Sequence, residues 1–98
     1  MPFPEQETRP FTEEGIESLD CPGCGIYGIF NADGCIYIGQ AGDIKKKLLE
    51  HLRGQSMQSA RILQNRPTYY LGMPAVMTRL DTQESQLIRE YNPIAQYG

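Results

Sequence analysis

The residues that decide the fold are GIYGIF at positions 25–30, NADG at 31–34 and CIYIG at 35–39. Two runs rich in β-branched and aromatic side chains flank a short loop with an Asp-Gly pair, a strong signal for a β-hairpin. Side chains alternate between the two faces of a strand, so Tyr27 should share a face with Ile29, while Ile26 and Phe30 face the other way. The other elements are placed outward from this hairpin.

A helix is predicted directly after the hairpin. Asp43 is a suitable N-cap, and Gly54 is suited to end the helix just after Arg53. Helical periodicity gathers the apolar side chains into one stripe, and it places a basic residue and the histidine together on one shoulder of that stripe. The stripe consists of Ile44, Leu48 and Leu52, and the shoulder of Lys47 and His51.

The remainder of the chain predicts a weaker helix at about 56–64, a strand over Thr68–Met73 and a last helix from about Thr82 to Tyr91. Pro67 and Pro74 bound the strand, and Pro93 stops the helix. The order β-β-α-(α)-β-α predicts an α/β (α+β) fold in which a small, antiparallel, three-stranded sheet is flanked by helices.

The charge is distributed unevenly. Residues 1–20 hold six acids and one base, whereas residues 21–98 hold six acids and eight bases. We therefore expect an acidic N-terminal arm at 1–20, with a short helical turn around Thr12–Leu19 capped by Thr12, and a mildly basic domain at 21–98. A solvated, mobile leader is the favoured interpretation of the arm. The alternative is that it folds over the basic surface near Lys45, Lys46 and Arg53.

The composition suits one small domain, with 98 residues and 40% hydrophobic content. No apolar run approaches the roughly 20 residues that a membrane-spanning helix needs, and the acidic start is unlike a signal peptide. Three cysteines are an odd number, which suits a reducing compartment. A soluble, cytoplasmic protein without a membrane partner is expected.

A Cys-Pro-Gly-Cys segment at 21–24 invites a zinc or redox interpretation. A structural zinc site needs four ligands, and the hairpin places Cys35 far from Cys24. A turn that carries two reduced thiols is favoured, and a metal shared across a dimer is the alternative.

The tripeptides Gly25-Ile26-Tyr27 and Tyr37-Ile38-Gly39 lie on the two strands of the hairpin. With His51, Glu84 and the Leu87-Ile88-x-x-Tyr91-x-Pro93 segment that follow, the chain resembles the GIY-YIG nuclease superfamily over about residues 21–96. The spacing is most similar to that of the N-terminal nuclease domain of the bacterial excinuclease incision subunit.

Tyr27 and Tyr37 are candidate catalytic residues. A phenol has an ordinary pKa of about 10, so a nearby cation such as Lys47 would be needed to make it a proton acceptor at neutral pH. The alternative is that both tyrosines are sheet residues chosen for packing. The resemblance favours catalysis, in which Tyr27 activates or orients the attacking water and Tyr37 assists.

Glu84 is an acid on the inward face of the last helix, because Leu87, Ile88 and Tyr91 follow it at helical spacing. A buried carboxylate needs a partner or a metal ion. The alternative is a capping box in which Glu84 reaches back to Asp81. The resemblance makes Glu84 the ligand of one Mg²⁺ or Mn²⁺ ion, held weakly without substrate because Mg²⁺ keeps several waters.

His51 is a candidate for proton transfer, against the alternative of a partly exposed histidine near a helix end.

Two residues depart from the family. Lys47 stands where the superfamily has an arginine that grips a phosphate, and Gln96 stands where it has an asparagine. Lysine keeps the charge without the bidentate fork, so catalysis could be weakened.

The resemblance implies a metal-dependent endonuclease that hydrolyses DNA phosphodiester bonds, in which Lys47 holds the phosphate and His51 supports proton transfer. Lys45, Lys46 and Arg53 are candidates for backbone contacts, which give affinity without sequence choice. Specificity would come from branched or damaged DNA, a homodimer or a protein partner. The alternative is a weakened or inactive module of the same fold that binds nucleic acid or protein.

Overall fold

The hairpin forms where the sequence predicts it in the computed structural model, which describes residues 3, 8–19 and 23–95. Strand β2 covers Gly25–Asn31 and β3 covers Gly34–Ala41. The side-chain oxygen of Asn31 closes the turn by accepting hydrogen bonds from the backbone N–H groups of Asp33 and Gly34, at 2.8 and 3.1 Å. Gly34 has φ +139°, a conformation that only glycine adopts easily.

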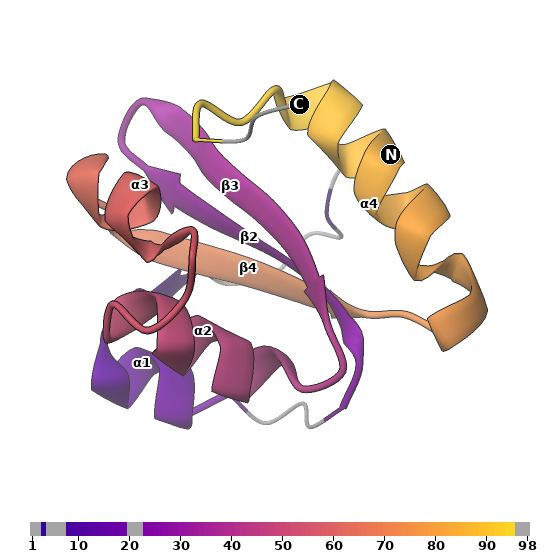
Figure 1. Ribbon diagram of the computed structural model, residues 1–98, viewed down its shortest axis with the longest axis horizontal. Coiled ribbons are helices and arrows are strands. Elements are labelled where there is room, and N and C mark those ends of the chain that lie inside the picture. The colour runs from indigo at the N-terminus through magenta and orange to yellow at the C-terminus, as the bar shows by residue number, and fades with distance from the viewer. Residues whose placement is uncertain (1–2, 4–7, 20–22, 96–98) are drawn as a thin grey trace.

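The sheet has four strands in the order β1-β4-β2-β3, all antiparallel (Figure 1). Strand β4 covers Tyr69–Pro74, and β1 covers Arg9–Pro10. The prediction of three strands is therefore wrong by one. Strand β1 has only two residues, too few for an alternation pattern, and it forms because β4 offers it an unpaired edge.

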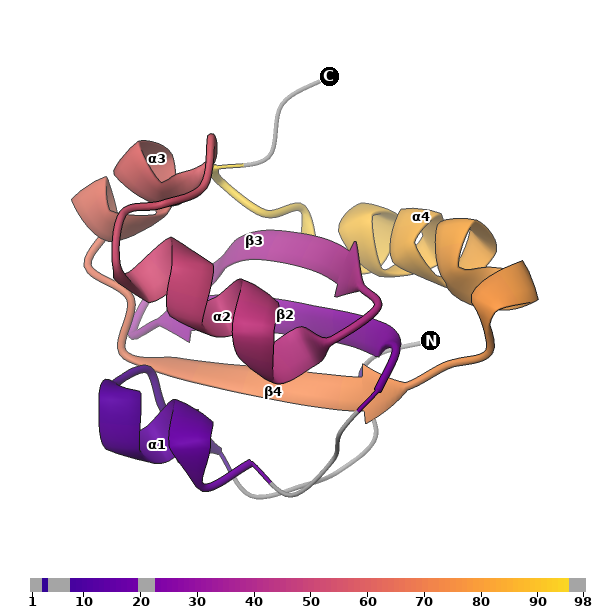
Figure 2. The same ribbon diagram turned by 60° about the horizontal axis from the view of Figure 1, so that its bottom comes forward.

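Helices cover both faces of the sheet (Figures 1 and 2). One face carries α1 (Glu13–Glu17), α2 (Ile44–Leu52) and α3 (Ser59–Gln64). The other side carries a 3₁₀ turn at Met77–Arg79 and α4 (Leu80–Tyr91). Asp43 caps α2 as predicted, because its side chain accepts from the N–H of Lys46 at 3.1 Å. No helix in the described part of the chain is long and apolar enough to cross a bilayer.

Two apolar clusters lie on opposite faces of the sheet, and the predicted alternation is confirmed. Tyr27 and Ile29 belong to the cluster beneath α1, α2 and α3, whereas Ile26 and Phe30 belong to the cluster beneath α4. A register shift opposite Ile29 and Phe30 marks a β-bulge in β3. Tyr37 pairs with Ile29 across this irregularity and packs against the same cluster as Tyr27.

The N-terminal segment is part of the structure over residues 8–19. Phe11 and Ile16 are buried in the cluster under α2, and the hydroxyl of Tyr70 donates to the carbonyl of Gly15 at 2.8 Å. Thr12 caps α1 as predicted. The interpretation of a solvated leader is therefore wrong for this segment, because its apolar side chains complete the core beside β4.

Candidate functional site

The centre of the candidate site is a hydrogen bond between two buried side chains. The hydroxyl of Tyr27, on β2, lies 2.6 Å from Nε2 of His51, on α2. Tyr37 completes an aromatic triangle, with its ring centroid 6.2 Å from that of Tyr27 and 5.5 Å from that of His51. The structure thus brings together both phenols and the imidazole that the sequence singled out.

Gly39 makes room for this arrangement. Tyr27 pairs with Gly39 across the hairpin, and its ring lies over the glycine. A Cβ atom at position 39 would lie 2.6 Å from Cζ of Tyr27, would overlap its hydroxyl, and would lie 2.9 Å from Cε2 of Tyr37. The glycine of the second tripeptide is therefore required by close packing of the two phenols.

His51 is fully buried, so the alternative of a partly exposed helix residue is wrong. Burial, reinforced by the charge of Lys47 and opposed by that of Glu50, lowers the pKa of His51 to about 4. The imidazole is therefore neutral at pH 7, and a neutral imidazole has one nitrogen free to accept a proton.

The pKa of Tyr27 is raised far above its ordinary value of 10, mainly by burial and further by the charges of Tyr37, Glu84 and Glu50. Lys47 is not among the groups that shift it. The expectation that Lys47 stabilises a Tyr27 phenolate is therefore not met. Tyr27 is a neutral phenol in this environment, and its hydroxyl shares a hydrogen bond with Nε2 of His51.

The side chain of Lys47 is 36% exposed, and its charge is close enough to act on His51. Its ammonium group is 3.6 Å from a carboxylate oxygen of Glu50, one turn further along α2. A pair this exposed is weak, because water screens both charges. The ammonium group of Lys47 can therefore leave the ion pair with Glu50 and bind a phosphate group instead.

Two serines that sequence reasoning missed extend the Tyr27–His51 pair. Nδ1 of His51 lies 2.5 Å from Oγ of Ser56, which lies 2.6 Å from Oγ of Ser59. The hydroxyl of Ser59 in turn donates to the backbone carbonyl of Glu50, at 3.3 Å. Ser56 follows α2 and Ser59 begins α3, a pattern that carries no recognisable motif, so only the folded chain places them behind the imidazole.

Glu84 lies on α4, across the outer strand β3 from the aromatic triangle. Its carboxylate accepts a long hydrogen bond, 3.5 Å, from the side-chain amide of Gln40. The same amide donates to Asp81 at 2.7 Å, so Gln40 joins two carboxylates. Burial and the charge of Asp81 raise the pKa of Glu84, against the hydrogen bond from Gln40.

The capping-box interpretation of Glu84 is wrong. Helix α4 begins at Leu80, with Arg79 in the N-cap position and no side-chain capping bond. Asp81 therefore lies inside the helix, and Glu84 lies one turn further on. The carboxylate is directed to Gln40, which sequence reasoning did not connect with it because the two are 44 residues apart.

The residues around Glu84 suit a hydrated divalent cation. The pKa of the Glu84 carboxyl is raised by burial and by the carboxylate of Asp81, and no cation is among the groups that shift it. Among the described residues, no three His, Cys, Asp or Glu side chains are grouped to hold a metal. A metal ion here would depend on Glu84, water and substrate oxygens, which is the ligand set that Mg²⁺ prefers.

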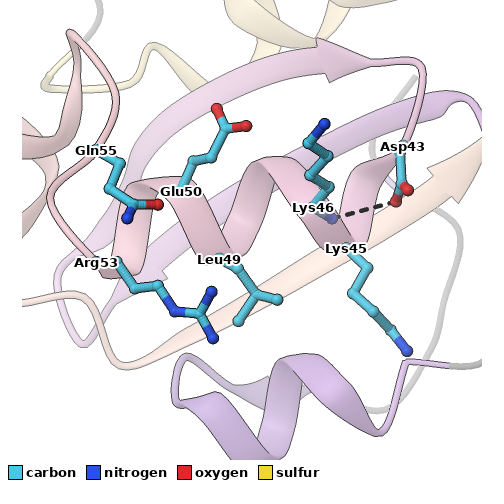
Figure 3. A pocket seen from close by; sticks show the side chains of 7 residues that line it. All are labelled: Asp43, Lys45, Lys46, Leu49, Glu50, Arg53 and Gln55. Atoms are coloured by element: carbon cyan, nitrogen blue, oxygen red, sulfur yellow. Dashed lines mark hydrogen bonds between the residues drawn. The ribbon is translucent and has the colours of Figure 1, made fainter.

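The three basic residues predicted to contact a DNA backbone lie along the outer surface of α2. They line a shallow hollow together with Asp43, Leu49, Glu50 and Gln55 (Figure 3). Lys45 and Arg53 are directed toward α1 (Figure 3). The guanidinium of Arg53 donates to both carboxylate oxygens of Glu13, at 2.8 and 3.1 Å. Of the three, Arg53 is therefore already engaged by the acidic segment.

Of the remaining candidates, only Cys24 and Cys35 are described, and both pack in the cluster beneath α4. Gln96 and Cys21 lie outside the described residues. The thiol of Cys24 donates to the carbonyl of Ala75, whereas Cys35 is buried and its pKa is raised to about 12 by burial. Cys24 and Cys35 are free thiols, and the interpretation of residues 21–24 as a turn with two reduced thiols stays a prediction.

Comparisons with known proteins support the resemblance. Residues 23–97 match the family model of the GIY-YIG catalytic domain. No curated protein shows a significant match. Solved structures of the GIY-YIG N-terminal endonuclease domain of UvrC from Thermotoga maritima share the fold. The form bound to magnesium is 24% identical over 88% of this chain and 100% of that chain, with a TM-score of 0.71. A tyrosine-to-phenylalanine mutant bound to its catalytic divalent cation is 23% identical over 89% of this chain and 100% of that chain, with the same TM-score of 0.71.

Proposed function

The chain belongs to the GIY-YIG family of catalytic domains, and on this premise we propose that it is a metal-dependent endonuclease that hydrolyses phosphodiester bonds of DNA. The observation that carries the proposal is the buried contact of 2.6 Å between the hydroxyl of Tyr27 and Nε2 of His51. A neutral imidazole that faces a phenol at a buried contact is suited to move a proton.

The proposed reaction uses Tyr27 as a conduit for a proton. A water molecule attacks the phosphorus, and its proton passes to the oxygen of Tyr27 while the phenol proton passes to Nε2 of His51. Because Tyr27 is neutral before and after this transfer, its raised pKa is no obstacle. The bond from phosphorus to the leaving sugar oxygen breaks, and that oxygen takes a proton from solvent. Tyr37 packs against both rings and holds them in place.

Glu84 is the proposed ligand for one Mg²⁺ or Mn²⁺ ion. The magnesium-bound UvrC domain is consistent with a divalent cation in this fold. The ion would supply Lewis-acid stabilisation of the charge that develops on the scissile phosphate. Gln40 would orient the carboxylate, and Asp81 would add negative charge that favours a cation. Lys47 would leave Glu50 to bind a phosphate oxygen.

A second candidate function is a DNA-binding module with little or no catalysis. The pairing of Lys47 with Glu50 favours it, because a lysine cannot grip a phosphate in the bidentate manner of an arginine. Lys45 and Lys46, which line the hollow on α2, would then supply backbone affinity without a reaction.

Plasmid nicking separates the two functions. Supercoiled DNA is incubated with the protein and Mg²⁺, Mn²⁺ or EDTA, and Tyr27→Phe and Glu84→Ala are compared with the wild type. We expect metal-dependent nicking by the wild type and its loss in both variants, while binding of duplex DNA is retained. Binding without nicking by the wild type supports the second candidate. Nicking that survives in both variants would show that another site or a contaminant cuts the DNA.

A further inference from the structure

The imidazole of His51 is held from both sides. Nε2 faces the hydroxyl of Tyr27, and Nδ1 faces the hydroxyl of Ser56. Beyond Ser56, the hydroxyl of Ser59 accepts from the backbone N–H of Ser56 at 3.0 Å and is itself buried. The hydroxyl of Ser59 then reaches the carbonyl oxygen of Glu50, in the last turn of α2.

This chain of hydrogen bonds has a direction. A hydroxyl has one proton to donate, and a carbonyl oxygen can only accept. When Ser59 donates to Glu50, it must accept from Ser56, and Ser56 must accept from Nδ1–H of His51. In the reverse direction, the bond between Ser59 and the carbonyl of Glu50 cannot be made. All the contacts are satisfied together only when every proton is directed away from Tyr27.

We propose that Ser56 and Ser59 are positioning residues that hold His51 as the Nδ1–H tautomer, with the lone pair of Nε2 directed at the hydroxyl of Tyr27. The use of this tautomer in proton transfer rests on the proposed function, whereas the preference of His51 for the tautomer follows from the hydrogen bonds alone. Without the serines, the imidazole is free to present Nε2–H to Tyr27, and that form cannot take up a proton from the phenol.

The same contacts suit the protonated form. When Nε2 gains a proton, Nδ1–H continues to donate to Ser56, so no hydroxyl has to rotate. Burial keeps the resting imidazole neutral, so the protonated form is a transient state of the transfer. The hydrogen bonds from Nδ1 to the serines are therefore the same before and after the transfer, so the serines need no reorganisation.

A competing explanation is that Tyr27 sets the tautomer alone, because its proton also favours a lone pair on Nε2. The two explanations make opposite predictions for two variants. Ser56→Ala removes the acceptor of Nδ1–H and leaves Tyr27 intact. Tyr27→Phe removes the donor to Nε2 and leaves the serines intact.

Nitrogen-15 NMR of the imidazole distinguishes these cases, because His51 is the only histidine. Spectra are recorded at pH 7 on the full chain without DNA or metal. We expect Nδ1–H in the wild type and in Tyr27→Phe, a mixture with substantial Nε2–H in Ser56→Ala, and recovery of Nδ1–H in Ser56→Thr. The exposed Ser85→Ala serves as a control and should leave the nitrogen shifts of His51 unchanged.

A wild-type spectrum of the Nε2–H form would overturn the proposal, as would an unchanged tautomer in Ser56→Ala. This readout needs no turnover, so it stands even when the proposed nuclease function fails. For the active protein, we expect Ser56→Ala to lower kcat by about tenfold to a hundredfold with unchanged KM for DNA, and Ser56→Thr to restore it. An equal loss in both variants with the tautomer preserved would indicate a merely structural role for Ser56.

Discussion

Tyr27 and His51 are 24 residues apart in the sequence, and their polar atoms meet at 2.6 Å within the core of the domain. The contact joins the strand that opens the hairpin to the helix that covers it. Each partner satisfies the other, because a buried hydroxyl or imidazole without a hydrogen bond would cost free energy. Stability and the proposed proton transfer therefore depend on the same pair.

Removing the phenol hydroxyl tests both roles. Tyr27→Phe keeps the packed ring but leaves Nε2 of His51 without its hydrogen-bond partner, at a cost of about 1–3 kcal/mol in the free energy of unfolding. We expect the rate of DNA nicking to fall by about 100-fold or more. Urea unfolding measures the loss of stability, and a plasmid assay measures the rate of nicking. Tyr69→Phe, on the opposite face of the sheet, is the matched control and should retain the wild-type rate.

The buried His51 predicts a loss of stability in acid. Below about pH 6.5 the unfolded chain binds a proton on His51, whereas the folded protein does not until about pH 4, because burial lowers the pKa to about 4. This contribution to stability is complete above pH 6.5 and is lost as the pH falls to 4, at up to about 1.4 kcal/mol per pH unit.

Urea unfolding between pH 7 and 4 measures this dependence. Carboxyl groups also titrate in the lower part of this range, so His51→Gln provides the baseline, and the difference in slope between the two proteins reports His51. Equal slopes would mean that the imidazole is protonated as readily in the folded protein as in the unfolded chain.

Gly39 should not tolerate a methyl group. Gly39→Ala places a Cβ atom against the ring of Tyr27, so we expect a loss of about 1–3 kcal/mol in unfolding free energy and a displaced phenol that no longer supports nicking. Gly42→Ala, three residues further along and open to solvent, is the control and should change stability by less than about 0.5 kcal/mol. Similar stability of the two variants would argue against the close packing of Tyr27 on Gly39.

The contact of Glu13 with Arg53 should weaken DNA binding. Glu13→Gln releases the guanidinium, so we expect tighter binding of duplex DNA at low salt and a salt dependence that is steeper by about one phosphate contact. Glu14→Gln removes the same charge from the next position of α1 and controls for net charge. Fluorescence anisotropy in EDTA measures the DNA affinity of the two variants and its dependence on salt. An equal gain in affinity in both variants would assign the effect to net charge rather than to Arg53.

The departure at Lys47 is tested by restoring an arginine. Lys47→Arg can bind a phosphate in a bidentate manner, so we expect the single-turnover rate of cleavage to rise by about tenfold, equivalent to about 1.4 kcal/mol. Lys46→Arg keeps the same charge one position earlier on an exposed side chain, and at saturating DNA it should leave the single-turnover rate unchanged. A slower Lys47→Arg variant would mean that the site is built around the shorter ammonium group.

Local chemistry accounts for what could be predicted. The Asp-Gly turn, the cap at Asp43 and the alternation that places Tyr27 beside Ile29 each act over a few neighbouring residues. For the same reason, the sequence misled where a local pattern competed with a distant contact. The Asp81–Glu84 spacing matches a capping box, but α4 begins at Leu80 and Gln40 takes the carboxylate instead.

The sequence by itself determined the hairpin, the helices that follow it and the face of the sheet that Tyr27 occupies, because backbone sterics and side-chain periodicity depend on near neighbours. Only the tertiary structure decided that Phe11 and Ile16 complete the core, and that Ser56 lies behind His51. Those contacts arise when apolar faces are buried together, which brings segments without any shared pattern to within hydrogen-bonding distance. The protonation state of the imidazole depends on that burial, which no local motif encodes.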